Sequence, residues 1–188
     1  PFIGVVRVLE FDSLSWVPIG SDIAEESVGD HFGQSVSISN DGSRVAVGAW
    51  NNTFGTGHVR VFEFNSSSWT QLGRAINGSS MYDGSGHSVA MSGDGSRVAI
   101  GAPQQLGGGG SGYVRVFRYV SSMWLQFGGD IVGEVADDGT GKAVSLSYSG
   151  NHVAIGADGA DGGGAEAGSV RVFEYIALSW LQIGSTID

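Results

Sequence analysis

The sequence predicts an all-β protein, a β-propeller of four-stranded antiparallel blades, of which about three and a half fit into the 188 residues. Two observations predict this fold class. The stretch GVVRVLEF, which begins at Gly4, recurs with small changes beginning at Gly57, Gly112 and Gly168. Bulky and small side chains also alternate along the strands of each repeat, as expected for sheets that stack face to face.

Each complete repeat is expected to hold four short strands. In the repeat spanning 85–131, an Asp-Gly turn at 93–96 joins the first two strands as a tight hairpin. No stretch shows the apolar periodicity and caps of a helix. The expected strands of this repeat are 87–92, 97–102, 114–119 and 124–131.

The repeat divides the whole chain, 1–188, into blades of one partial propeller. The first segment, 4–23, contains only a third and a fourth strand and is half a blade. Pro18 lies in its fourth strand, which agrees with an outer edge position, since proline is tolerated only at sheet edges. The complete blades are expected at 30–76, 85–131 and 140–188.

The two faces of each blade are predicted to differ. Val36 and Ile38 point to one face of the first strand, and Ser35, Ser37 and Ser39 point to the other. An exposed outer face would carry charged residues, so a face of small neutral residues is expected to receive the bulky face of the next blade.

Three and a half blades do not close a ring, because closed propellers usually have four to eight. A simple homodimer would bring two identical outer half-blades and no inner strands. We expect the inner strands to come from the far terminus of a longer chain. Assembly with other protein chains and an open stack of blades are the alternatives.

Composition excludes several classes of function. The net charge is −10 with nine basic residues, too few for a nucleic-acid-binding face. There is no cysteine for disulfides or thiolate sites, and no apolar run long enough for membrane insertion. The acidity suits an extracellular setting.

Short motifs in these repeats resemble the FG-GAP repeats of the integrin α-subunit propeller. FG stands at 32–33 and GAP at 101–103. The other copies are altered: SG at 85–86, TG at 140–141, GAW at 48–50 and GAD at 156–158. The resemblance covers nearly the whole chain and implies a β-propeller.

The calcium loops that the resemblance implies are not expected here. Integrin repeats carry DxDxDGxxD between the first two strands, whereas this chain has NDGS, GDGS or YSGN, which are hairpin turns. Calcium needs six to eight oxygen ligands, so no cofactor is expected from these turns. The weak candidates for a calcium ion lie on the loop 158–168: Asp158, Asp161 and Glu166.

Other residues recur once per blade. Asp30, Asp83 and Asp138 are expected to bond the backbone as Asx-turns; the alternative is a ring of carboxylates for cations. The four VRV arginines are expected to pair with acidic residues between blades or to cover apolar surface with their stems. The four tryptophans are expected to fill the gaps between blades, and the alternative for them is stacking on sugars. These residues are Arg7, Arg60, Arg115 and Arg171, and Trp16, Trp69, Trp124 and Trp180.

Three N-glycosylation sequons begin at Asn51, Asn65 and Asn77, in expected loops. Together with the resemblance, they indicate a secreted or cell-surface glycoprotein.

No catalytic constellation is visible, so the sequence favours a non-catalytic extracellular propeller, used for adhesion or for building a cell-surface assembly. Its partners would be proteins and possibly glycans, bound through the rim loops 51–57, 77–84 and 132–139. Two alternatives stay open. One is a polysaccharide-acting hydrolase or lyase with its site in the missing blades, and the other is a structural repeat of a surface filament.

Overall fold

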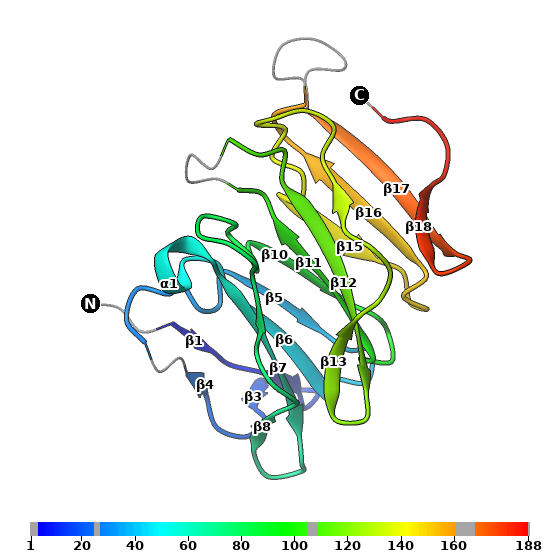
Figure 1. Cartoon of the computed structure of the whole chain (residues 1–188). Coiled ribbons are helices and arrows are strands. Elements are labelled where there is room, and N and C mark those ends of the chain that lie inside the picture. The colour runs from blue at the N-terminus through cyan, green and yellow to red at the C-terminus, as the bar shows by residue number, and fades with distance from the viewer. Residues whose placement is uncertain (1–3, 25–26, 105–108, 161–167, 188) are drawn as a thin grey trace.

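The structure, a computed structural model, describes residues 4–24, 27–104, 109–160 and 168–187. Its sheets are antiparallel and stack in chain order, so that the N-terminal and C-terminal ends lie at opposite ends of the stack (Figure 1). The fold is all-β, with about three and a half propeller blades. We refer to them in chain order as the half-blade and the first, second and third full blades.

The half-blade contains only a third and a fourth strand, each interrupted. Pro18 pairs with Leu9 on the outer strand, where its missing N–H costs no ladder hydrogen bond. The pairs are β1 (Val5–Val6) with β4 (Ile23–Ala24), and β2 (Leu9–Phe11) with β3 (Trp16–Pro18).

The full blades share one topology, in which four strands pair in chain order and a short segment returns to the inner end of the third strand. The first full blade contains β5 (Ser35–Ile38), β6 (Arg44–Ala49), β7 (His58–Phe64), β8 (Trp69–Gln71) and β9 (Ile76–Asn77). The second contains β10 (Ser88–Met91), β11 (Arg97–Ala102), β12 (Tyr113–Val120), β13 (Met123–Gln126) and β14 (Ile131–Val132). The third contains β15 (Ala143–Leu146), β16 (His152–Ala157), β17 (Ser169–Ile176) and β18 (Ser179–Gln182).

Two local features differ from the sequence prediction. The expected fourth strand 124–131 is broken into β13 and β14, because Gly128 has φ +84° and lies against Trp180 of the next blade. A short helical element, α1 (Asn52–Gly55), occupies a loop. Thr53 and Phe54 inside it have positive φ, so α1 is a tight turn and no regular helix.

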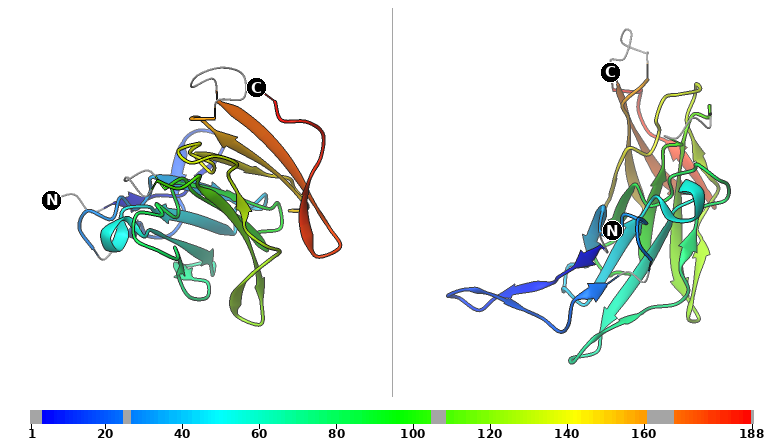
Figure 2. Two further views of the ribbon diagram at one scale, coloured as in Figure 1. Left: turned by 45° about the horizontal axis from the view of Figure 1, so that its top comes forward. Right: turned by 90° about the vertical axis from the view of Figure 1, so that its left-hand side faces the viewer.

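The core lies between blades, where the bulky face of one packs on the small-residue face of the one before it. Between the first and second full blades, Ala46 is buried with Met91 and Ile100. Ala99 of the second blade is buried in the same way with Val153 and Ile155 of the third. The predicted face-to-face stacking is therefore confirmed, and Figure 2 shows the stack from two further sides.

Glycine and serine set how closely the blades approach. A Cβ on Gly48 would lie 2.1 Å from the carbonyl oxygen of Gly86, and one on Gly101 would lie 2.0 Å from that of Gly141. Beside these glycines, the Ser35 and Ser88 hydroxyls donate hydrogen bonds of 2.7 Å to the same two carbonyls. The small residues thus allow backbone-to-backbone contact between neighbouring sheets.

The tryptophans join each blade to the one before it. The indole N–H of Trp69 donates to the carbonyl of Ile19, that of Trp124 to Leu72 and that of Trp180 to Phe127, all at 2.8 Å. The expectation that these side chains fill the gaps between blades is met for these three. Trp16 is 66% exposed and packs on Phe11 of its own hairpin.

Both ends of the stack are open as far as the described residues show. Val36 and Ile38 on β5 are 54% and 50% exposed, whereas their counterparts Val89 and Met91, covered by the preceding blade, are 8% and 7% exposed. A groove of about 480 Å³ runs beside these exposed side chains and the half-blade. At the other end, a Cβ on Gly156 would meet nothing closer than 3.4 Å. The stack therefore begins with an uncovered bulky face and ends with an uncovered small face.

Candidate functional site

The loops predicted to bind partners gather on one rim of the stack. This rim carries the connections from second to third strands and from each blade to the next (Figure 1). The loops 51–57 and 77–84 are in contact, since Tyr82 N–H donates to Phe54 O and Gly84 N–H donates to Gly55 O. The loop 132–139 follows on the next blade and is bonded to Gly110 and Gly112.

The repeat-wide aspartates support this rim from inside. Asp83 and Asp138 are buried and accept hydrogen bonds from backbone N–H groups three and four residues before them. Asp30 accepts a bond from the Asn52 amide. Asp83 and Asp138 thus bond the backbone as expected, but toward the preceding loop, not in the forward direction of an Asx-turn, whereas the Asp30 bond is to a side chain. No cluster of three metal-ligating side chains occurs among the described residues.

The hairpin turn between the first two strands of a blade uses its own oxygen atoms. In the first full blade, the Asp41 carboxylate accepts bonds from the Ser39 hydroxyl and from the N–H and hydroxyl of Ser43. These bonds, the Ser39 hydroxyl above all, lower the pKa of Asp41 to about 2. The carboxylate is thus part of the turn.

The weak calcium candidates are not assembled by the described residues. Asp158 forms an ion pair of 3.0 Å with Lys142. Asp161 and Glu166 lie outside the described residues.

The three sequon asparagines have different surroundings. Asn65 is exposed, and its side-chain oxygen caps the hairpin at Ser67 and Ser68. Asn77 is also exposed but lies in β9, not in the loop expected for it. The amide of Asn51 is partly covered and donates to the carbonyl of Gly29.

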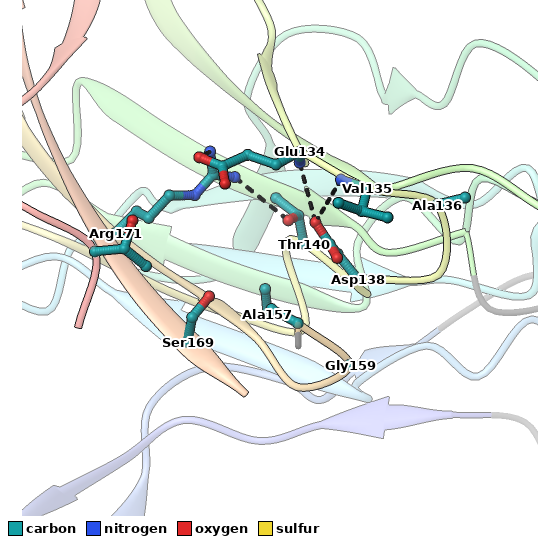
Figure 3. A pocket seen from close by; sticks show the side chains of 11 residues that line it. Glu134, Val135, Ala136, Asp138, Thr140, Ala157, Gly159, Ser169 and Arg171 are labelled. Atoms are coloured by element: carbon teal, nitrogen blue, oxygen red, sulfur yellow. Dashed lines mark hydrogen bonds and ion pairs between the residues drawn. The ribbon is translucent and has the colours of Figure 1, made fainter. Parts of the chain in front are cut away.

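A polar pocket of about 450 Å³ opens on the rim between the second and third full blades (Figure 3). The loop 134–140 forms one side, and the inner ends of β16 and β17 form the other. Its polar side chains are Glu134, Asp138, Thr140, Ser169, Arg171 and Thr186.

Arg171 is the central charge of this pocket. Its side chain is only 8% exposed, and it extends from β17 toward the loop 134–140 (Figure 3). It donates to Glu134 Oε1 at 3.3 Å, to the Val132 carbonyl at 3.1 Å and to Thr140 Oγ1 at 3.4 Å. The carboxylate of Glu134 is 65% exposed, so among the described residues the buried cation has one long, solvent-screened ion pair.

The equivalent arginines are paired differently. Arg7 forms a two-pronged ion pair with Asp22, and Arg115 forms one with Asp130, with N–O distances of 2.7–2.8 Å. Both pairs lie within a blade, so the expectation of pairing between blades was wrong for them. Each aspartate lies on the returning segment of the same blade, next to the third strand. Arg171 alone of these three pairs across a blade interface.

Sequence reasoning missed this pocket because it treated the VRV arginines as one repeated feature. The signal lay in departures from the repeat around Arg171. Ser169 stands where the second full blade has Tyr113, and Thr186 stands where it has Asp130.

Comparison with known proteins agrees with this architecture. Residues 24–62 match the family model described as "FG-GAP repeat". No curated protein matches. No helix among the described residues is long and apolar enough to cross a membrane.

Solved propeller structures share the fold at low sequence identity. The periplasmic gluconolactonase of Pseudomonas aeruginosa is 19% identical with a TM-score of 0.64, over 100% of this chain and 50% of that one. TolB from Acinetobacter baumannii is 10% identical with a TM-score of 0.50, over 95% of this chain and 40% of that one. The chain thus spans half or less of these proteins. Residues 24–62 are thus similar to an FG-GAP repeat, and the chain as a whole has the fold of a β-propeller.

Proposed function

We propose that the chain is a non-catalytic extracellular propeller that takes part in adhesion or builds a cell-surface assembly. One observation carries the proposal: the first full blade presents Val36 and Ile38 to solvent at the position where every later blade is covered. Isolated apolar residues on a surface need no explanation, but a groove beside an incomplete sheet indicates an interaction site.

The surface that would cover Val36 and Ile38 has a defined chemistry. At the next interface, the hairpin of β5 and β6 covers Val89 and Met91 with serine, alanine and glycine. The partner of the groove is therefore a hairpin of the same kind, contributed by further blades of the same chain or by another protein chain. It would add its second strand to the free edge of the half-blade.

The proposal is tested with a synthetic peptide of residues 32–50, titrated into the protein and followed by calorimetry. We expect saturable binding that is lost in Val36→Lys and retained in the matched control Leu14→Lys, which changes a 91% exposed side chain that does not line the groove, in the turn between β2 and β3. Binding that is unaffected by Val36→Lys, or no binding, would contradict the proposal.

An enzymatic role is the second candidate, because the solved propellers of similar fold include a gluconolactonase. Assays with acidic polysaccharides and gluconolactone separate the two functions. Turnover of either compound by the purified chain would overturn the non-catalytic interpretation. Mass mapping of native material at Asn51, Asn65 and Asn77 tests the extracellular location, which fails if all three are unmodified.

A further inference from the structure

The second full blade shows a complete set of partners for an arginine at this position. Arg115 lies over the ring of Tyr113 at 4.5 Å and pairs with both oxygen atoms of Asp130. The Tyr113 hydroxyl donates to Asp83 Oδ2 at 2.7 Å. The phenol thus fills the space between the arginine and the buried aspartate, and Asp130 neutralises the arginine.

The third full blade lacks both of these groups. Ser169 replaces the tyrosine and leaves the space beside Arg171 open. This space is part of the pocket of about 450 Å³. Thr186 replaces the aspartate and supplies no charge. Arg171 and Asp138 therefore face one cavity without the hydroxyl and the carboxylate that occupy the equivalent positions one blade earlier.

In the third full blade, Glu134 takes the place of the Asp130 carboxylate, but its interaction with the arginine is weak. Glu134 stands where the second full blade has Ser79, and it reaches Arg171 through one bond of 3.3 Å from the solvent side. A buried guanidinium whose one described carboxylate partner is exposed can exchange that carboxylate for a ligand carboxylate at small cost, since the desolvation of Arg171 is already part of the fold.

We propose that this pocket binds a hydroxylated carboxylate of sugar size, such as a hexuronate. Its carboxylate takes the place of Asp130 on Arg171, and a hydroxyl takes the place of the Tyr113 phenol and donates to Asp138. The hydroxyls of Ser169, Thr140 and Thr186 provide further polar contacts around the ring. The volume lies within the range of small-molecule sites. Phosphate fits less well, because Asp138 and Glu134 repel a dianion.

The inference goes beyond the proposed assembly role, and it is tested by titrating glucuronate and galacturonate, with glucose as the neutral control. The unmodified chain should bind a uronate, and glucose at least tenfold more weakly. Ser169→Tyr and Thr186→Asp each restore a group that the second full blade tolerates. Both are expected to weaken uronate binding at least tenfold. Ala75→Asp introduces the same charge at the equivalent position of the first full blade and should leave binding unchanged.

The variant Glu134→Gln provides a second test, which does not depend on filling the pocket with a larger side chain. Removing the competing anion should tighten uronate binding several-fold, because the ligand carboxylate no longer displaces Glu134. The inference is overturned if neither uronate binds at millimolar concentration, if glucose binds equally well, or if the pocket variants bind like the unmodified chain. Loss of hairpin binding with intact uronate binding would refute only the assembly role, and the reverse result would refute only this site.

Discussion

Single glycines decide how closely neighbouring blades pack. Gly48 and Gly101 occupy the same repeat position, and each lies directly against a backbone carbonyl of the following blade. The same position in the third full blade, Gly156, faces no following blade within the described residues and has room for a methyl group. One residue type at one position therefore has two different packing environments in the same chain.

We expect Gly101→Ala to lower the free energy of unfolding by about 2–3 kcal/mol, since the new methyl group forces the second and third full blades apart. Gly156→Ala is the matched control and should be neutral or stabilising by up to about 0.5 kcal/mol, because alanine replaces a flexible glycine in a strand. Urea unfolding measures both. Equal effects of the two changes would show that blade contact is not the cause.

His87 gives the fold a dependence on pH. Burial lowers the pKa of His87, Lys142 lowers it further, and Asp158 acts in the opposite direction. Nδ1 of His87 is buried without a hydrogen-bond partner among the described residues. The unfolded chain, in which His87 regains its ordinary pKa near 6.5, therefore binds more protons than the folded chain below that pH.

Stability should therefore fall as the pH drops through the unfolded pKa of histidine, from about 7.5 to about 5.5. His87→Asn removes the titration and should reduce this pH dependence, although it also alters packing against Trp50. The comparison is thus made between slopes, by urea unfolding at several pH values. A slope that does not change in the variant would assign the effect to other groups.

At the scale of the strand, the outer hairpins are fastened by one indole each. Trp124 reaches from β13 to the carbonyl of Leu72 in the preceding blade, where its ring lies against Gly73. Arg44 and Arg97 form a second link, because each donates to a backbone carbonyl in the first hairpin of the following blade. Each full blade is therefore joined to its neighbour at its outer edge and at its hairpin end.

Replacing Trp124 measures the outer link. Trp124→Phe should cost about 1 kcal/mol of unfolding free energy for the lost hydrogen bond, and Trp124→Ala about 3 kcal/mol because the ring is lost as well. Trp16→Ala, at the equivalent but exposed position, should cost less than about 1 kcal/mol. Thermal melts of the three variants test this order, which a large effect of Trp16→Ala would contradict.

The strands show how far the sequence could lead. The second strand expected at 97–102 coincides with β11, and the third, expected at 114–119, lies within β12, because alternation and the Asp-Gly turn are local signals. The break at Gly128 recurs at Gly73 and Gly184, where the glycine also has a positive φ, and a backbone angle of this kind is not recorded in the pattern of strand residues. The pocket around Arg171 could not be predicted from the sequence either. It arises where the repeat changes, and only the packed blades show that Ser169 and Thr186 line the same cavity.

At the scale of the whole molecule, the N-terminal end of the stack exposes an apolar surface. The exposed β5 face and the groove beside the half-blade present an incompletely covered surface of the kind that promotes association. The third full blade ends the stack with a face of small residues around Gly156, beside the exposed side chains of Val170 and Ile187. The two ends of the stack therefore offer different surfaces for association.

We expect the double change Val36→Lys and Ile38→Lys to reduce self-association in concentrated solution while the melting temperature stays within a few degrees. Light scattering and a thermal melt provide the two measurements. Val89→Lys is the comparison, since the same substitution at a covered position buries an unpaired charge and should unfold the chain. If the double variant self-associates as strongly as the unmodified chain, the surface responsible for association lies outside the exposed face of β5.

The equivalence of the blade interfaces makes the chain extensible. The tryptophan link and the glycine–carbonyl contact are repeated after about one blade of sequence, so a duplicated segment would bring both halves of each contact with it. Inserting a second copy of residues 85–139 after residue 139 should lengthen the stack by one blade without redesign of any surface. Growth by tandem duplication is thus available to this gene at no cost in packing, and the number of blades becomes a quantity that selection, or an engineer, can set.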